Sequence, residues 1–205
     1  MPRDLTPAEA WAALREGNDR FVRGEMAHPS QSIERRTEVS AEQHPFAVLF
    51  GCSDSRVAAE IIFDQGLGDL FVVRTAGHVL DTTVIGSIEY GVSVLGAPLV
   101  VVLGHDSCGA VAAATAALSD GAVPPGFVRA VVDRVIPSIV GLLGGDQPFD
   151  AAALGHEHVK HTVQMLQGYS VSLAEAVAEG RCAIIGLEYT LADGKVSVAE
   201  VVGDV

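Results

Sequence analysis

The sequence predicts a single α/β domain with a mainly parallel central sheet, helices on both faces, an N-terminal helical arm and a C-terminal β-hairpin or edge strand. Short apolar runs indicate fully buried strands, and segments with helical spacing separate these runs. Strands that alternate with helices favour right-handed crossovers and a parallel sheet. No repeat or long linker divides the 205 residues, so we expect one domain over residues 1–205, with the arm at residues 1–40.

The first expected element is a helix at residues 6–23. Its apolar residues recur at helical spacing, and Gly24 follows as an end signal. These apolar residues are Trp11, Leu14, Phe21 and Val22. We interpret Trp11 as a packing residue on this stripe. The chain from Gly24 to about residue 44 is polar and shows little periodicity.

Three apolar runs are expected to form buried strands, at residues 46–50, 70–73 and 99–103. The third run, Leu-Val-Val-Val-Leu, is the clearest of them. The end of the chain is typical of a β-hairpin. There, apolar segments at residues 182–191 and 196–201 flank an Asp-Gly turn signal.

Helices are expected between and after these strands. The segment 82–95 follows the second strand, with Asp81 as a cap at its start and Gly96 as an end signal. Further helices are expected at residues 108–118, 127–143, 156–166 and 173–178.

Composition and charge limit the function classes. A formal net charge of −13 argues against a nucleic-acid partner, because no basic stripe is available to neutralise phosphates. No apolar run approaches the roughly 18–20 residues that span a bilayer, so no membrane partner is expected. The first residues lack the apolar segment of a secretory signal, and we expect a cytoplasmic location. Three cysteines indicate thiols or metal ligands rather than a disulfide framework.

The reactive residues fall directly after two of the expected strands. Cys52 follows the first strand, and His105 and Cys108 follow the third. Ligands of open parallel sheets bind beyond the carboxyl ends of the strands, so these residues should lie close together. Two thiolates and one imidazole suit zinc and leave its fourth position for water. The alternative is that two buried cysteines and a histidine serve only in packing.

Two motifs carry a resemblance to a known family. Cys-Ser-Asp-Ser-Arg at 52–56 and His-Asp-Ser-Cys-Gly at 105–109 resemble the paired motifs of the β-class carbonic anhydrases. The similarity includes Gln43, Phe-Val-Val-Arg at 71–74 and Ile-Glu-Tyr at 88–90, and it covers nearly the whole chain.

The resemblance also indicates a branch of the family. One branch has a bicarbonate-binding tryptophan three residues before the first cysteine, where this chain has Leu49. Together with Gln43, this residue places the chain nearer the open-site, plant-like branch.

The resemblance implies one Zn²⁺ per chain, held by Cys52, His105 and Cys108. Asp54 would accept a hydrogen bond from the zinc-bound water or hydroxide, and Arg56 would hold Asp54 by charge-assisted hydrogen bonds. The alternative for Asp54 and Arg56 is an ordinary surface ion pair.

The resemblance further implies a substrate pocket completed by a neighbouring subunit of a homo-oligomer, either a dimer or a tetramer. Gln43 would donate its amide to the substrate oxygen, and Phe71 and Tyr90 would line the neighbour's pocket. Gly109 is expected to matter as a small residue beside Cys108 that permits close approach. Otherwise Gln43 is a solvated loop residue, and the two aromatic residues belong to the core.

The expected reaction is the reversible hydration of carbon dioxide to bicarbonate and a proton, by attack of zinc-bound hydroxide. Two alternatives remain open. One is hydrolysis of carbon disulfide or carbonyl sulfide on the same zinc site, and the other is a non-catalytic zinc protein of the same fold. A thiol-redox protein is disfavoured because the chain has no Cys-x-x-Cys motif.

Other histidines and the third cysteine are given structural interpretations. The segment His-Glu-His-Val-Lys-His at 156–161 has Lys160 where a metalloprotease motif needs histidine, so we expect a solvated helix face. His78 is interpreted as a structural histidine, although it could relay protons. Cys182 is interpreted as a small buried hydrophobic residue.

Overall fold

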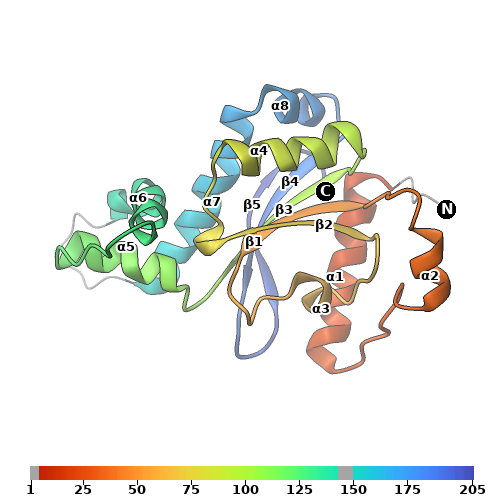
Figure 1. The fold of residues 1–205 in the computed structure, drawn as a ribbon, viewed down its shortest axis with the longest axis horizontal. Helices are drawn as coiled ribbons and strands as arrows, with labels where there is room; N and C mark the ends of the chain where they lie inside the picture. The colour runs from red at the N-terminus through yellow and green to blue at the C-terminus, as the bar shows by residue number, and fades with distance from the viewer. Residues whose placement is uncertain (1–4, 143–149) are drawn as a thin grey trace.

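The protein is described by a computed structural model for residues 5–142 and 150–205. Its core is a five-stranded sheet with the strand order β2-β1-β3-β4-β5 (Figure 1). The strands are β1 (Ala47–Cys52), β2 (Leu70–Thr75), β3 (Leu99–His105), β4 (Ala183–Tyr189) and β5 (Val196–Val202). Strands β1 to β4 are parallel, whereas β5 pairs antiparallel with β4. The predicted mainly parallel sheet with a C-terminal hairpin is therefore confirmed.

Helices surround this sheet. The α-helices are α1 (Pro7–Arg23), α2 (Ile33–Glu38), α3 (Ala59–Ile62), α4 (Thr82–Glu89), α5 (Gly109–Ser119), α6 (Val128–Ile139), α7 (Ala151–Tyr169) and α8 (Val171–Ala178). Three short helical turns are η1 (Ala76–His78), η2 (Tyr90–Val94) and η3 (Val140–Leu142). Within the described ranges, no helix is both long and apolar enough to cross a membrane.

The sheet separates two apolar clusters. On one face, Leu49 and Val101 pack with α1 and α3. On the other face, Val48 and Val100 pack with α4, α7 and α8. Helices α5 and α6 project from the carboxyl edge of the sheet (Figure 1). They form a third cluster with the start of α7, and this cluster includes Cys52.

Helix α1 packs on its own chain. Thr6 and Glu9 form a capping box at its start. The amide of Asn18 donates to the carbonyl oxygens of Ile62 (3.2 Å) and Gly194 (2.8 Å), which ties the helix to α3 and to the hairpin turn. Trp11 packs against the apolar cluster that contains Leu14 and Ile62, so its interpretation as a packing residue is confirmed.

Several boundaries differ from those expected. Strands β1 and β3 run further than predicted and end at Cys52 and His105. The helix expected at 82–95 is divided into α4 and a π-helical turn, η2. Gly91 in this turn approaches β1 so closely that a Cβ there would lie 2.4 Å from Val48 Cγ2.

Other differences concern helices. Helix α7 is longer than expected, whereas α2 and α3 were not predicted because six and four residues are too few to show a helical period. Residues 1–4 of the expected arm and residue 143 of an expected helix lie outside the described residues.

Candidate metal centre

Three candidate ligands meet at the carboxyl edge of the sheet. Cys52 is the last residue of β1, and His105 is the last residue of the adjacent β3. Cys108 caps the start of α5 after a sharp turn in which Ser107 has φ 53°. Neighbouring parallel strands thus bring together residues that are more than fifty positions apart.

The three side chains form a compact and buried donor set. Their two sulfur atoms and one imidazole nitrogen all lie within 4.8 Å of one another. The residues are only 5–7% exposed. Two thiols and one imidazole are a preferred zinc set, and a site with three protein ligands leaves the fourth position open.

The histidine is oriented as a zinc ligand requires. Its Nδ1 lies 2.7 Å from the carbonyl oxygen of Asp106, so Nδ1 carries the proton and donates it. Its Nε2 is buried and makes no hydrogen bond among the described residues. The lone pair of Nε2 is therefore available to a metal ion, and the residues present fit zinc.

The thiols are prepared for a cation as well. The amide of Gly77 donates to Cys52 Sγ at 3.3 Å. A hydrogen bond from the Cys108 thiol lowers the pKa of Cys52 to about 4. The same hydrogen bond raises the pKa of Cys108, because the thiol that donates it holds its proton more tightly. A cation that displaces the shared proton gains two thiolates at once.

Asp54 and Arg56 form a bidentate pair beside the ligands. Arg56 donates to Asp54 Oδ1 from Nε (3.0 Å) and to Oδ2 from Nη2 (2.8 Å), and its backbone amide also donates to Oδ1 (2.9 Å). These hydrogen bonds hold the pKa of Asp54 well below its usual range. Oδ2 also lies 4.0 Å from Nε2 of His105, so the carboxylate borders the metal position.

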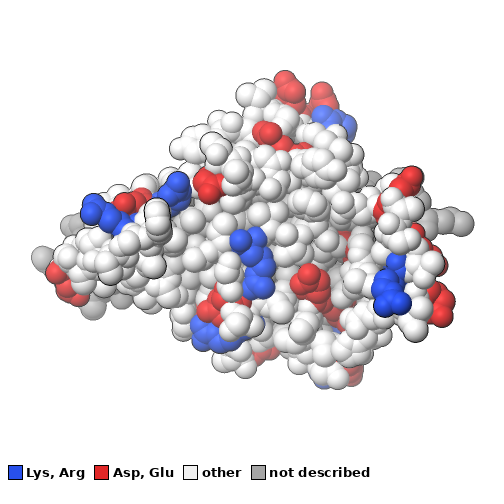
Figure 2. Space-filling model, in the orientation of Figure 1, with Lys and Arg blue, Asp and Glu red and all other residues white. Residues whose placement is uncertain are grey.

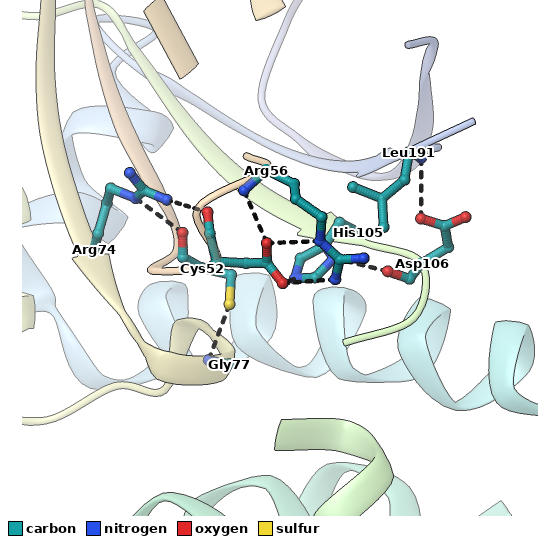
Figure 3. A network of polar contacts seen from close by, with 8 residues as sticks. Cys52, Arg56, Arg74, Gly77, His105, Asp106 and Leu191 are labelled. Carbon is teal, nitrogen blue, oxygen red and sulfur yellow. Dashed lines mark hydrogen bonds and ion pairs between the residues drawn. The ribbon is translucent and has the colours of Figure 1, made fainter. Parts of the chain in front are cut away.

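Arg74 is a residue of the site that the motifs did not single out for a role. Its Nε donates to the carbonyl oxygen of Cys52 (2.9 Å), and its Nη2 donates to that of Asp54 (2.6 Å). Figure 3 shows Arg74 and Arg56 on opposite sides of the Cys52 loop. Arg74 therefore fixes the backbone that carries both the ligand and the carboxylate. The available signal was its place at the end of the Phe-Val-Val-Arg segment at 71–74, which belongs to the resemblance.

The predicted pocket residues are not gathered at this centre within one chain. Phe71 pairs with Val48, four residues before Cys52, which is about 13 Å along the strand. Tyr90 is 46% exposed and lies against Phe71, with the ring centroids 6.1 Å apart. Gln43 lies in an exposed stretch before β1, near its amino end. Their roles toward a neighbouring subunit stay predictions.

Gly109 is the first residue of α5 and is exposed. A Cβ at this position would meet no atom within 4 Å. A single chain therefore supplies no steric reason for a glycine here, and the role expected for Gly109 stays a prediction.

Two expectations about the histidines are wrong. His158 is not on a solvated face but is 2% exposed, because it lies on the inward stripe of α7 with Val159 and Thr162. Its neighbour His156 is partly exposed and lies 2.8 Å from Glu188. His78 is buried, but among the described residues neither of its ring nitrogens has a hydrogen-bond partner, so it is not the satisfied structural histidine that was expected.

Cys182 is also buried, in agreement with its interpretation. Burial raises the pKa of its thiol to about 12. It therefore stays protonated at neutral pH, in contrast to Cys52.

Comparisons with known proteins agree with this geometry. The carbonic anhydrase family matches residues 47–196. A carbonic anhydrase of Mycolicibacterium smegmatis is 56% identical over 210 residues, which cover 100% of this chain and 98% of that protein. Carbonic anhydrase 2 of Mycobacterium tuberculosis is 55% identical, with the same coverage of both chains.

Solved structures agree on the fold. One comes from a crystallographic study of two tetrameric β-carbonic anhydrases of Sordaria macrospora. It superposes with a TM-score of 0.69 at 22% identity, covering 93% of this chain and 92% of that chain. The chain belongs to the β-class carbonic anhydrases, zinc-dependent enzymes that interconvert carbon dioxide and bicarbonate.

Proposed function

We propose that this enzyme hydrates carbon dioxide at one zinc ion per chain held by Cys52, His105 and Cys108, with Asp54 and Arg56 as its catalytic pair. The observation that carries the proposal is the position of Asp54. Its Oδ2 borders Nε2 of His105 at 4.0 Å, while Arg56 holds both carboxylate oxygens. An ordinary surface ion pair has no reason to face a buried donor set.

The chemistry divides between the metal and the chain. When bound, zinc supplies a Lewis acid that lowers the pKa of water, so that hydroxide is available near neutral pH. The three ligands are themselves nearly enclosed by protein. Attack of hydroxide on the carbon of carbon dioxide gives bicarbonate, and one proton leaves for solvent in each cycle.

Asp54 accepts a hydrogen bond and so orients the group that donates it. The hydrogen bonds of Arg56 hold the pKa of Asp54 well below the usual range, which favours its carboxylate form. So weak a base can accept a hydrogen bond from the water or the attacking hydroxide without retaining a proton, and the proton of the cycle passes to solvent or buffer. Arg74 supports this role because it holds the backbone carbonyl of Asp54.

The oligomer proposed here is a homodimer or homotetramer in which Phe71 and Tyr90 complete the pocket of a neighbouring subunit, and Gln43 donates its amide to the substrate oxygen. Exposed apolar side chains near edge strand β2 support it, since Tyr90 is 46% exposed and Val94 is 64% exposed. The tetrameric relatives of Sordaria macrospora also support it. The open space around Gly109 suits a substrate or a neighbouring chain.

Two further proposals concern the whole chain. Residues 1–205 act as one domain, supported by a single sheet that connects all three apolar clusters. The enzyme works in the cytoplasm, supported by three free thiols.

On the face shown in Figure 2, basic side chains are scattered among acidic ones, as expected for a protein without a nucleic-acid partner.

The test is a stopped-flow assay of carbon dioxide hydration on the purified protein, with zinc measured in the same sample. We expect turnover and about one zinc per chain. Asp54→Asn should keep the zinc and lose most of the turnover. Asp133→Asn is the matched control, because Asp133 forms an exposed pair with Arg129 on α6 and is not among the clustered ligands. Equal turnover in both variants would overturn the role proposed for Asp54.

A further inference from the structure

A buried histidine outside the ligand set contacts the metal centre through one backbone residue. Nε2 of His158 lies 2.8 Å from the carbonyl oxygen of Gly77, and a carbonyl only accepts, so Nε2 donates. The amide of the same Gly77 donates to Cys52 Sγ at 3.3 Å. One glycine thus links a histidine of α7 to a ligand at the end of β1.

Turn η1, which contains Gly77, fits tightly between the two thiol-bearing segments. Gly77 has φ 63°, in the left-handed region that favours glycine. A Cβ there would lie 2.5 Å from the Cβ of Ala110, two residues after Cys108. Only a glycine therefore lets the backbone approach Cys52 Sγ from this side.

Glycine also makes the turn pliable, so its position must be set by contacts from outside. Ser138 on α6 lies 2.7 Å from Nδ1 of His158, and both residues are buried. The ring of His78 lies against the ring of His158, with centroids 4.3 Å apart. Helices α6 and α7 thereby fix the direction of the Gly77 carbonyl, and with it the adjoining amide.

We propose that His158 is a positioning residue of the zinc site, which holds Gly77 so that its amide stays directed at Cys52 Sγ. The contact keeps the sulfur in place and reduces the electron density that it donates to the metal. Groups behind the ligands commonly control metal affinity in this way. The inference rests on the ligands proposed above and extends them to a residue 81 positions from Gly77.

Two substitutions of His158 separate the hydrogen bond from simple packing. Glutamine places its amide nitrogen near the position of Nε2 and can still donate to Gly77. Asparagine reaches only the position of Nδ1, so it keeps the contact with Ser138 and loses the one with Gly77. Thr162→Val is the control for α7, because among the described residues this buried hydroxyl donates to the backbone carbonyl of His158 and leaves its ring untouched.

The measurements are the rate of zinc release to a chelator and the thiolate-to-metal absorption of the cobalt-substituted protein. We expect His158→Asn to release zinc about tenfold faster and to shift the cobalt band. His158→Gln and Thr162→Val should stay near the native chain in both. The proposal would be overturned if His158→Asn released zinc at the native rate. It would also be overturned if the asparagine and glutamine variants released zinc equally faster than the native chain.

A folding failure would not end the test. If His158→Asn does not fold, His158→Met fills the same buried space without a group that can donate to Gly77. Faster zinc release is expected from this variant, and release at the native rate would contradict the proposal. A native chain that binds no zinc would instead refute the ligand assignment, so the two failures are distinguishable.

Discussion

Two groups of contacts flank the three proposed metal ligands, and they differ in exposure, charge and sequence range. On one side the loop of Asp54 and Arg56 is local and charged, and the Arg56 side chain is 54% exposed. On the other side Gly77 and His158 are neutral, buried and 81 positions apart. Proton exchange needs access to water, whereas a fixed ligand geometry needs a packed surrounding. We therefore expect the loop of Asp54 and Arg56 to serve in proton exchange, and the turn of Gly77 to serve in holding the metal ligands.

The largest effect should come from the ligands between these two sides. Cys108→Ser replaces a thiolate that zinc requires, so we expect most of the metal and nearly all turnover to be lost. Elemental analysis and the hydration assay measure both. Cys182→Ser is the matched control, because this thiol is buried in another cluster, and the variant should keep its zinc. A Cys108→Ser protein with full zinc would contradict the ligand set.

Asp54→Asn tests the loop side alone. The amide has nearly the same shape but is a poor acceptor, so turnover should fall about 100-fold. The zinc content should not change, because Asp54 is not among the clustered ligands. A variant that loses zinc in proportion to activity would instead make Asp54 part of the metal-retaining group.

Arg56→Ala should have a smaller effect on the same side. The Arg56 hydrogen bonds lower the pKa of Asp54, so their loss raises that pKa toward its ordinary value. Activity should fall at every pH, by about tenfold on the alkaline side and by more on the acidic limb, because this limb should move to higher pH.

The lowered pKa of Asp54 also determines how the free energy of unfolding depends on pH. The lowered pKa of Asp54 contributes stability that is present above the unfolded pKa and is lost as pH falls through the folded pKa. The variant lacks this contribution at neutral pH, so acid should destabilise it less than the native chain. Hydration rates from about pH 4 to 9 and urea unfolding from about pH 2 to 7 measure the two effects. An unmoved acidic limb would show that Arg56 does not control the proton of Asp54.

Gly77→Ala tests the turn side, where the expected effect is on stability. A left-handed residue with a Cβ costs about 1–2 kcal/mol, and the contact with Ala110 adds to this cost. Gly86→Ala in α4 is the control, because a Cβ there meets nothing within 4 Å. The control should be neutral or stabilising by about 0.5–1 kcal/mol. Equal urea midpoints for both variants would show that the turn tolerates a side chain.

The same contrast explains what could be predicted from the sequence. Buried apolar runs revealed β1 and β3, and the residues that follow them revealed Cys52, His105 and Cys108. Asp54 and Arg56 were predicted from the Cys-Ser-Asp-Ser-Arg motif at 52–56, which resembles that of the β-class carbonic anhydrases. All of these residues lie within short motifs that directly follow a strand.

Contacts between distant elements were not predictable in this way. The polar segment at 156–161 predicts a solvated face for His158 only when the helical period of the apolar residues around it is left out. The residues Leu154, His158, Thr162 and Leu166 recur every four positions and form the buried stripe of α7. Even that stripe would not have identified Gly77 as the partner, since only the packing of α7 against η1 brings the two together.

The most direct test of the central claim is X-ray absorption at the zinc edge on the active native enzyme. We expect about one zinc per chain, with two sulfur ligands at about 2.3 Å and one imidazole nitrogen at about 2.0–2.1 Å. An active enzyme without zinc, or a zinc ion that lacks two sulfur ligands, would contradict it.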